Sequence, residues 1–176
     1  MTLLSLLTVL IIALNTDTNM FISDADLSTV LNERQLLEVI TPNTSNRNRA
    51  ENYAIDEASY YLNFQYDTDT IFGYKVFDYD ATAIYTIGQI VINSDALGFT
   101  CIQDAPVGTA LTDSNYFEEG EARNPLIVMI VVDIFAYHLF SRTGTNRIPQ
   151  HIIDRYEMAL KKLKEIRKQT MNPLLP

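Results

Sequence analysis

The chain has 176 residues, of which 47% are hydrophobic, and its formal net charge is −9. This composition can bury a core and excludes an intrinsically disordered chain, while the acidic balance excludes wrapping of nucleic acid by charge alone. The single cysteine, Cys101, excludes an intrachain disulfide and a zinc site built on cysteines.

An apolar stretch precedes the first predicted helices. Residues 3–14 (LLSLLTVLIIAL) have the length of a signal-peptide core, but no Lys or Arg precedes them. They are also shorter than the ~17–25 residues that span a bilayer as a helix. We therefore expect residues 1–19 to form a packed arm without membrane association, with Leu3, Leu7 and Ile11 in contact with this subunit or a neighbour.

Two short helices are predicted before residue 43. Ser23 can cap a helix whose first turn holds Asp24 and Asp26, where the helix dipole favours negative charge. A second short helix follows over residues 36–40. It ends there because Pro42 disfavours the helical conformation at the residue before it.

A longer helix is predicted over residues 44–65. Its small and apolar residues recur at intervals of three and four, as on one face of a helix, at Ala50, Ala54, Ala58, Tyr61 and Leu62. Tyr53, Tyr60 and Phe64 form an adjacent aromatic stripe. A helix that is apolar on two sides is expected between two neighbours in a bundle.

The next segment, residues 73–121, has a different character. Helical spacing is lost, glycines recur, and three runs favour strands, at residues 74–79, 89–93 and 98–103. Residues 93–95 (NSD) are typical of a turn and predict a hairpin between the second and third runs. We therefore predict an inserted β subdomain.

Two further helices close the chain. Asn124 and Pro125 suit the cap and the first position of a helix. Residues 126–140 are apolar except at Asp133 and His138, which favours a buried core helix over a strand. The last helix is predicted from Pro149 to about residue 169, with one apolar stripe.

Charge is distributed unevenly along the chain. Residues 67–121 hold ten acidic residues and one lysine, for a net charge of −9, whereas residues 142–170 hold eight basic and three acidic residues, for a net charge of +5. These segments are either solvated surfaces on separate elements or complementary surfaces. In the second case, the basic helix of one copy meets the acidic face of the next.

Residues that carry chemistry are sparse. His138 and His151 have no ligand spacing between them, and no nucleophile, phosphate-binding or dinucleotide motif occurs. The Asp-x-Asp pairs at 67–69 and 78–80 lack the glycine and terminal glutamate of a calcium loop, and they are expected to bind backbone groups in turns. We expect no enzyme, no metal and no cofactor, and we expect Cys101 to be a buried apolar residue.

Four segments of the helical parts, taken in order, are similar to one known family. They are residues 20–27 (MFISDADL), 58–67 (ASYYLNFQYD), 126–140 (LIVMIVVDIFAYHLF) and 155–163 (RYEMALKKL). Over residues 20–72 and 122–168, the chain resembles the tailed-phage head–tail connector or head-completion (neck adaptor) family, of the kind found in Mu-like prophages.

The resemblance implies a structural virion protein of the phage neck, assembled in the host cytoplasm. Members of this family form rings, commonly twelvefold, beneath the portal protein. Such a ring continues the channel for the genomic DNA without sequence-specific binding and offers a platform for the next neck or tail protein. The extension before Met20 and the insert at 73–121 depart from the family.

The insert resembles small chitin-binding-type modules at residues 85–91 (YTIGQIV), 98–101 (GFTC) and 115–117 (NYF). Those modules usually carry tryptophans at the sugar face, and this chain has none. The remaining aromatic residues can still stack on a sugar or a peptide. The alternative function is therefore a secreted or surface carbohydrate-binding protein, with residues 3–14 as its export signal.

The predicted fold is mainly α, a small bundle of four to five helices with an inserted β-rich subdomain. Its predicted parts are an arm (1–19), a helical connector domain (20–72 and 122–170), the β insert (73–121) and a tail (171–176). Beyond the arm, contacts with neighbouring subunits or partners are expected at Tyr85, Phe99, Tyr116, Phe117, Arg155 and Lys162.

Overall fold

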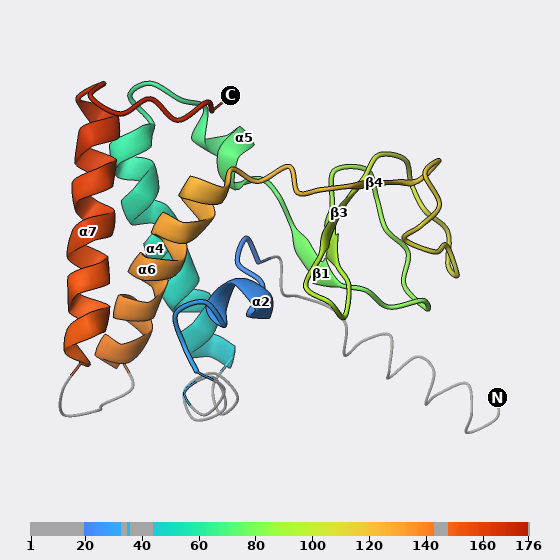
Figure 1. Ribbon diagram of the computed structural model, residues 1–176, viewed down its shortest axis with the longest axis horizontal. Coiled ribbons are helices and arrows are strands. Elements are labelled where there is room, and N and C mark those ends of the chain that lie inside the picture. Colours follow the sequence, from blue (N-terminus) through green and yellow to red (C-terminus); the bar gives the residue numbers. More distant parts are fainter. Residues whose placement is uncertain (1–19, 33–34, 36–43, 143–147, 176) are drawn as a thin grey trace.

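The structure is a computed structural model that describes residues 20–32, 35, 44–142 and 148–175. Within these residues it contains five helices and one four-stranded mixed sheet, with 46% helix and 11% strand. The elements are α2 (Asp24–Leu27), α4 (Thr44–Leu62), α5 (Thr68–Phe72), β1 (Val76–Asp78), β2 (Ile90–Ile92), β3 (Gly98–Cys101), β4 (Phe117–Glu119), α6 (Pro125–Arg142) and α7 (Gln150–Arg167) (Figure 1). The predicted mainly-α class is therefore wrong, and the fold is mixed α/β.

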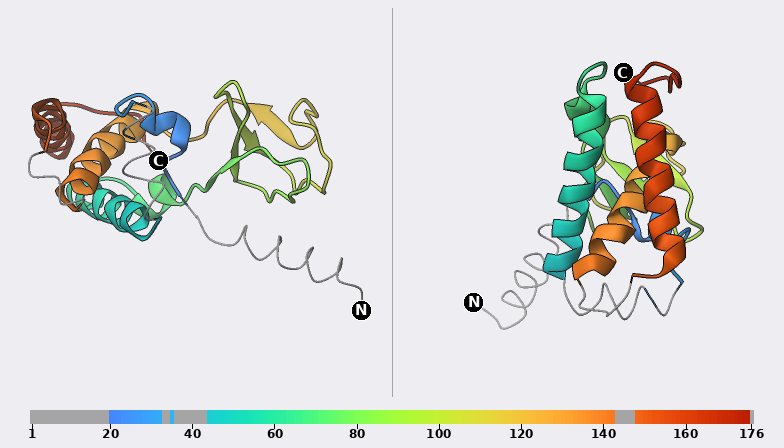
Figure 2. Two further views of the ribbon diagram at one scale, coloured as in Figure 1. Left: turned by 90° about the horizontal axis from the view of Figure 1, so that it is seen from below. Right: turned by 90° about the vertical axis from the view of Figure 1, so that its left-hand side faces the viewer.

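The three long helices α4, α6 and α7 lie side by side, and α6 packs against both of the others (Figure 2). Ala54 and Ala58 of α4, Ile134 of α6 and Leu163 of α7 are fully buried in their shared core. Each such leucine or isoleucine contributes roughly 1.5–3 kcal/mol of burial free energy. We call α2, α4, α5, α6 and α7 together the helical unit.

Two of the helix starts follow the sequence prediction. Ser23 and Asp26 form a capping box, in which the Asp26 backbone N–H donates to Ser23 Oγ at 3.1 Å and the Ser23 backbone N–H donates to Asp26 Oδ2 at 2.7 Å. The side-chain oxygen of Asn124 accepts the backbone N–H of Leu126, directly after Pro125 opens α6. These caps satisfy backbone donors that have no partner inside the helix.

All four described strands lie within residues 73–121, which we call the β module. Strands β1 and β2 are parallel, whereas the pairs β2–β3 and β3–β4 are antiparallel. The predicted hairpin is confirmed, since Val91 pairs with Phe99, and Asn93 Oδ1 accepts the backbone N–H groups of Asp95 and Leu97 in the turn. Strand β4 and the parallel pairing of β1 were not predicted.

Strand β2 is buried on both faces of the sheet, and this explains the wrong fold class. Successive side chains of a strand point to opposite faces. Val91 faces a core with Phe117 that belongs to the β module alone, whereas Ile90 and Ile92 face the other way and pack with Ala25 of α2. A small cluster on the second face of the sheet therefore contacts α2, which short apolar runs in the sequence do not reveal.

Helix α4 packs against both α6 and α7, as predicted, but the aromatic stripe along α4 and just after its end is exposed rather than buried. Tyr53, Tyr60 and Phe64 are 46–80% exposed. Instead, the guanidinium carbon of Arg142 lies 4.3 Å from the ring centroid of Tyr53, and that of Arg167 lies 5.2 Å from the ring centroid of Tyr60. Arginines at the ends of α6 and α7 therefore lie over the faces of these exposed rings.

Candidate partner-contact surfaces

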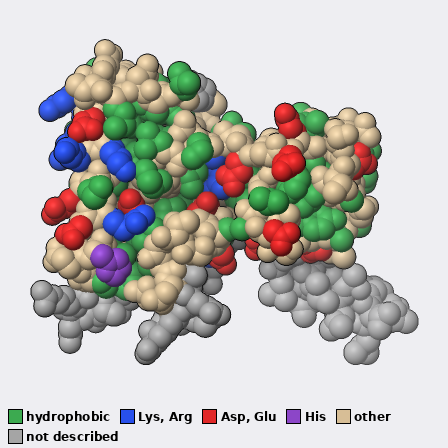
Figure 3. Space-filling model, viewed as in Figure 1, with side chains coloured by type: hydrophobic (Ala, Val, Ile, Leu, Met, Phe, Trp, Pro, Cys, Tyr) green, Lys and Arg blue, Asp and Glu red, His purple; other side chains and the backbone are tan. Residues whose placement is uncertain are grey.

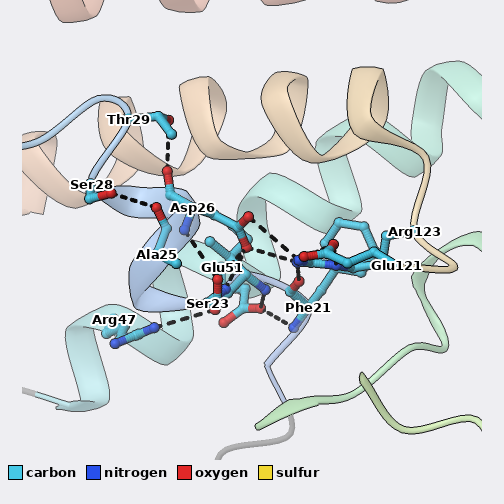
Figure 4. A network of polar contacts seen from close by, with 11 residues as sticks. Phe21, Ser23, Ala25, Asp26, Ser28, Thr29, Arg47, Glu51, Glu121 and Arg123 are labelled. Atoms are coloured by element: carbon cyan, nitrogen blue, oxygen red, sulfur yellow. Dashed lines mark hydrogen bonds and ion pairs between the residues drawn. The ribbon is translucent and has the colours of Figure 1, made fainter. Parts of the chain in front are cut away.

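A buried arginine joins the β module to the helical unit (Figure 4). Arg123 lies just before α6, and its side chain is fully buried. It donates to the carbonyl oxygen of Phe21, to Asp26 Oδ2 at 2.8 Å and, through Nε, to Glu121 Oε2 at 2.9 Å. The guanidinium thus ties the chain leaving the β module to α2, which fixes how the two parts sit relative to each other.

A buried glutamate completes this junction. Glu51 of α4 accepts the backbone N–H groups of Phe21 and Ile22 at 2.5 and 3.0 Å. Burial raises the pKa of Glu51, while these two hydrogen bonds and the nearby Arg47 and Arg123 oppose the rise. The carboxyl group therefore anchors the segment before α2 at a cost in desolvation.

The exposed side of α6 and α7 carries a strip of cations and methionines, which we call the basic face. It consists of Arg155, Met158 and Lys162, which share one side of α7 at i, i+3 and i+7, and of Met129 on α6. Both methionines are exposed, and Lys162 Nζ lies 4.0 Å from the sulfur of Met129. On the face shown in Figure 3, side chains of Lys and Arg gather over the helical unit.

A buried aspartate holds one member of the basic face in place. Asp133 of α6 is 5% exposed, and its Oδ1 accepts the Nε–H of Arg155 at 2.7 Å. Burial raises the pKa of Asp133, and the charge and hydrogen bond of Arg155 oppose that rise. Arg155 therefore has a structural partner inside its own chain and a solvent-facing side.

The β module exposes a second apolar and charged surface, which we call the acidic tip. Its apolar members are Ile84, Ile87 and Val107, which are all exposed. They lie on two neighbouring segments joined by the backbone bridge of residues 85 and 105. Asp104 Oδ1 accepts the backbone N–H of Ile87 at 2.9 Å, which places a carboxylate among these side chains.

The aromatic residues predicted as contacts of the β module lie mostly inside it. Tyr85 and Phe117 are each 3% exposed and pack edge to face, with ring centroids 5.9 Å apart. Phe99 and Tyr116 are half-buried and pack against the same core. As contact residues, Tyr85 and Phe117 are therefore corrected to core residues, because an aromatic ring in this small module is worth more buried than exposed.

The other predicted contacts divide into two groups. Leu3, Leu7 and Ile11 lie outside the described residues, as does the short helix predicted over residues 36–40. Arg155 and Lys162 are half-buried members of the basic face.

No protein-family model matches this chain, and no curated protein or solved structure is detectably similar to it.

One cluster joins the three long helices through titratable side chains. Glu57 of α4 lies 2.9 Å from His138 Nε2 of α6 and accepts the hydroxyl of Tyr156 of α7 at 2.8 Å. The ring of Tyr156 stacks on that of Tyr137, with centroids 4.0 Å apart. Burial and the carboxylate of Glu57 raise the pKa of Tyr156. The tyrosine is therefore a poor acid, and the cluster acts as a link between helices.

Other features predicted from the sequence take structural roles. Asp67 caps α5, and Asp80 accepts the backbone N–H and the hydroxyl of Thr82, so one aspartate of each pair binds backbone groups as predicted. Cys101 is buried as predicted, and burial raises the pKa of its thiol. Among the described residues, no group of three or more His, Cys, Asp and Glu is arranged to hold a metal ion.

Helix α6 is the one described helix whose length and apolar composition would suffice to cross a membrane. The core helix of a globular fold passes the same test. Most of α6 is buried against α4 and α7, and Asp133 lies near its middle.

Sequence reasoning missed both methionines of the basic face and every residue of the acidic tip. The sequence does contain a signal for the basic face, because Met158 falls between Arg155 and Lys162 at helical spacing. It contains no signal for the acidic tip, since Ile87 and Val107 meet only through the pairing of two distant loops.

Proposed function

We propose that the chain is a structural subunit of the neck of a tailed phage, which assembles as a ring between the portal protein and the next neck or tail protein. The observation that carries this proposal is spatial. The four segments that resemble the connector family form α2, the end of α4, α6 and α7, and these helices lie together in one unit (Figure 1). Residues 73–121, which depart from the family, contain all four described strands.

The proposed mechanism is mechanical and electrostatic. The ring, commonly twelvefold in the family that the chain resembles, continues the portal channel in the virion after assembly in the host cytoplasm. Where acidic residues of the segment 67–121, with its net charge of −9, line the channel, they repel phosphates and let genomic DNA slide without binding. No catalytic step is required of any residue.

The alternative, a carbohydrate-binding protein, loses its main support. A sugar-stacking surface needs aromatic rings that are open to solvent. Of the three residues proposed to stack, Tyr85 and Phe117 are buried in the core of the β module and Tyr116 is half-buried. No other described feature favours sugar binding over a contact with protein.

Native mass spectrometry of the full chain, alone and with the portal protein of the same phage, tests the proposal. We expect a complex with several copies of the chain on one portal ring. Antibodies against the chain are expected to label phage particles where head meets tail. A chain that never joins the portal and is absent from particles would contradict the proposed function.

A further inference from the structure

We propose that the acidic tip of one copy docks on the basic face of the next copy, so that the ring is built by a head-to-tail contact. This inference rests on the proposed function, since it names the surfaces through which the ring forms. Its residues are Ile84, Ile87, Asp104 and Val107 on one copy and Met129, Arg155, Met158 and Lys162 on the other.

The first argument is the position of the two surfaces. Helix α7 lies at one end of the long axis of the molecule, and the β module lies at the other (Figure 1). The two surfaces differ, since the basic face lies on α6 and α7 and the acidic tip lies on the β module, where Ile87 lines a shallow hollow with Asp69 of α5. Two different surfaces give a heterologous contact, in which each copy keeps one free surface of each kind. Such a contact closes into a ring when the rotation between copies fits, whereas a twofold dimer would need a single self-complementary surface.

The second argument is charge. The segment that contains the acidic tip, residues 67–121, has a net charge of −9, and the segment that contains α7, residues 142–170, has a net charge of +5. On the face shown in Figure 3, the β module displays Asp and Glu but no Lys or Arg. The tip itself carries one of the ten carboxylates of its segment, Asp104, so the complementarity belongs to the two segments as wholes, which attract each other when unlike ends meet and repel when like ends meet.

The third argument is the apolar content of both surfaces. Ile84, Ile87 and Val107 gather on adjoining loops, and exposed apolar groups of this kind mark protein contact sites. Met129 and Met158 offer flexible side chains that adapt to an apolar partner. Burial of these residues excludes water from the charges at the rim, which strengthens their attraction.

Two variants of the full chain test the contact. The face variant carries Met158→Ala with Lys162→Gln, and the tip variant carries Ile87→Ser with Asp104→Asn, which keeps an oxygen for the backbone N–H of Ile87. We expect each alone to self-associate at least about tenfold more weakly than the wild type. An equal mixture should form a 1:1 dimer and no longer chain, because only one intact surface of each kind remains.

The matched control carries Arg49→Gln with Asp56→Asn on the exposed side of α4 and should associate like the wild type. The assemblies are measured by sedimentation velocity and native mass spectrometry, with and without the portal protein. Circular dichroism checks that each variant is folded. If the single variants assemble like the wild type, the proposed interface is wrong; the proposed neck function still stands if the wild type binds the portal protein. If the wild type associates through these surfaces but does not bind the portal protein, the interface is supported and the proposed neck function is wrong. A wild type that stays monomeric in both settings overturns both.

Discussion

Arg123 is the residue on which the junction between the two parts depends most. Its buried guanidinium serves Asp26, Glu121 and the carbonyl of Phe21 at once, a geometry that a planar fork of donors can satisfy and a lysine cannot. Removing one partner of a buried ion pair leaves the others uncompensated.

We therefore expect Arg123→Ala to lower the free energy of unfolding by about 3–5 kcal/mol. Arg123→Lys should recover only part of that loss, because one ammonium group cannot reach all three acceptors. Urea unfolding followed by circular dichroism measures both. Arg49→Ala, at an exposed position of α4, is the control and should change the free energy by less than about 0.5 kcal/mol. An equally small effect of Arg123→Ala would contradict the role of the junction.

Glu51 makes the free energy of unfolding decrease as pH rises. Burial raises its pKa above the ordinary value, so the folded state binds the proton more tightly than the unfolded chain. Its contribution to stability is therefore fully present at pH values below the ordinary pKa and is lost as pH rises through the raised pKa.

Glu51→Gln removes this titration but keeps an oxygen that can accept the backbone N–H groups of Phe21 and Ile22. The stability of the variant relative to the wild type should therefore rise as pH increases above the ordinary glutamate pKa of ~4.3. Urea unfolding of both proteins at several pH values in this range gives the difference. A relative stability that falls with rising pH would show that the hydrogen bonds and Arg47 outweigh burial.

At the scale of elements, the pair of Asp133 and Arg155 links α6 to α7. Asp133 is buried, but the side chain of Arg155 is 39% exposed, so solvent screens part of the attraction. Arg155→Ala leaves a buried unpaired carboxylate and should cost about 1–3 kcal/mol near pH 7. Adding Asp133→Leu should restore most of the loss, because an apolar side chain suits the site. Thermal unfolding of the two single variants and the double variant measures the coupling, and purely additive effects would contradict it.

Elements whose signals are local were predictable from the sequence. The caps at Ser23 and Asn124 and the buried alanines of α4 follow from residue type and spacing alone. The parallel pairing of β1 with β2 did not follow, because strands of three residues carry little pattern and their partners are set by contacts between distant segments.

The candidate surfaces divide in the same way. Arg155 and Lys162 could be chosen from the basic pattern of the last helix. An aromatic residue in a turn-rich segment can belong to the core or to the surface, and the sequence alone does not distinguish the two. Tyr85 was predicted as a surface contact, whereas its packing against Phe117 places it in the core. The same ambiguity misplaced the aromatic stripe of α4, where Arg142 and Arg167 cover the rings.

At the scale of the whole molecule, the fold has one core in the helical unit and a separate one in the β module. The core around Val91 and Phe117 contains no residue of a described helix, whereas Leu139 of α6 is buried in the helical core. The two are connected through Ile90 and Ile92 and through the junction at Arg123. A chain of this build can lose order in the β module while the helical unit stays folded.

Phe117→Ala tests this separation. Removing a buried aromatic ring costs about 3–5 kcal/mol, and a core this small has few other contacts to compensate for the loss. Hydrogen exchange should therefore accelerate at the amides of β2, β3 and β4, while the amides of α6 and α7 keep their protection. Leu139→Ala is the matched change in the other core and should accelerate exchange in α4, α6 and α7.

Equal acceleration in both parts by Phe117→Ala would mean that the molecule unfolds as one cooperative body, so that docking of the acidic tip would stabilise the helices of the same copy as well.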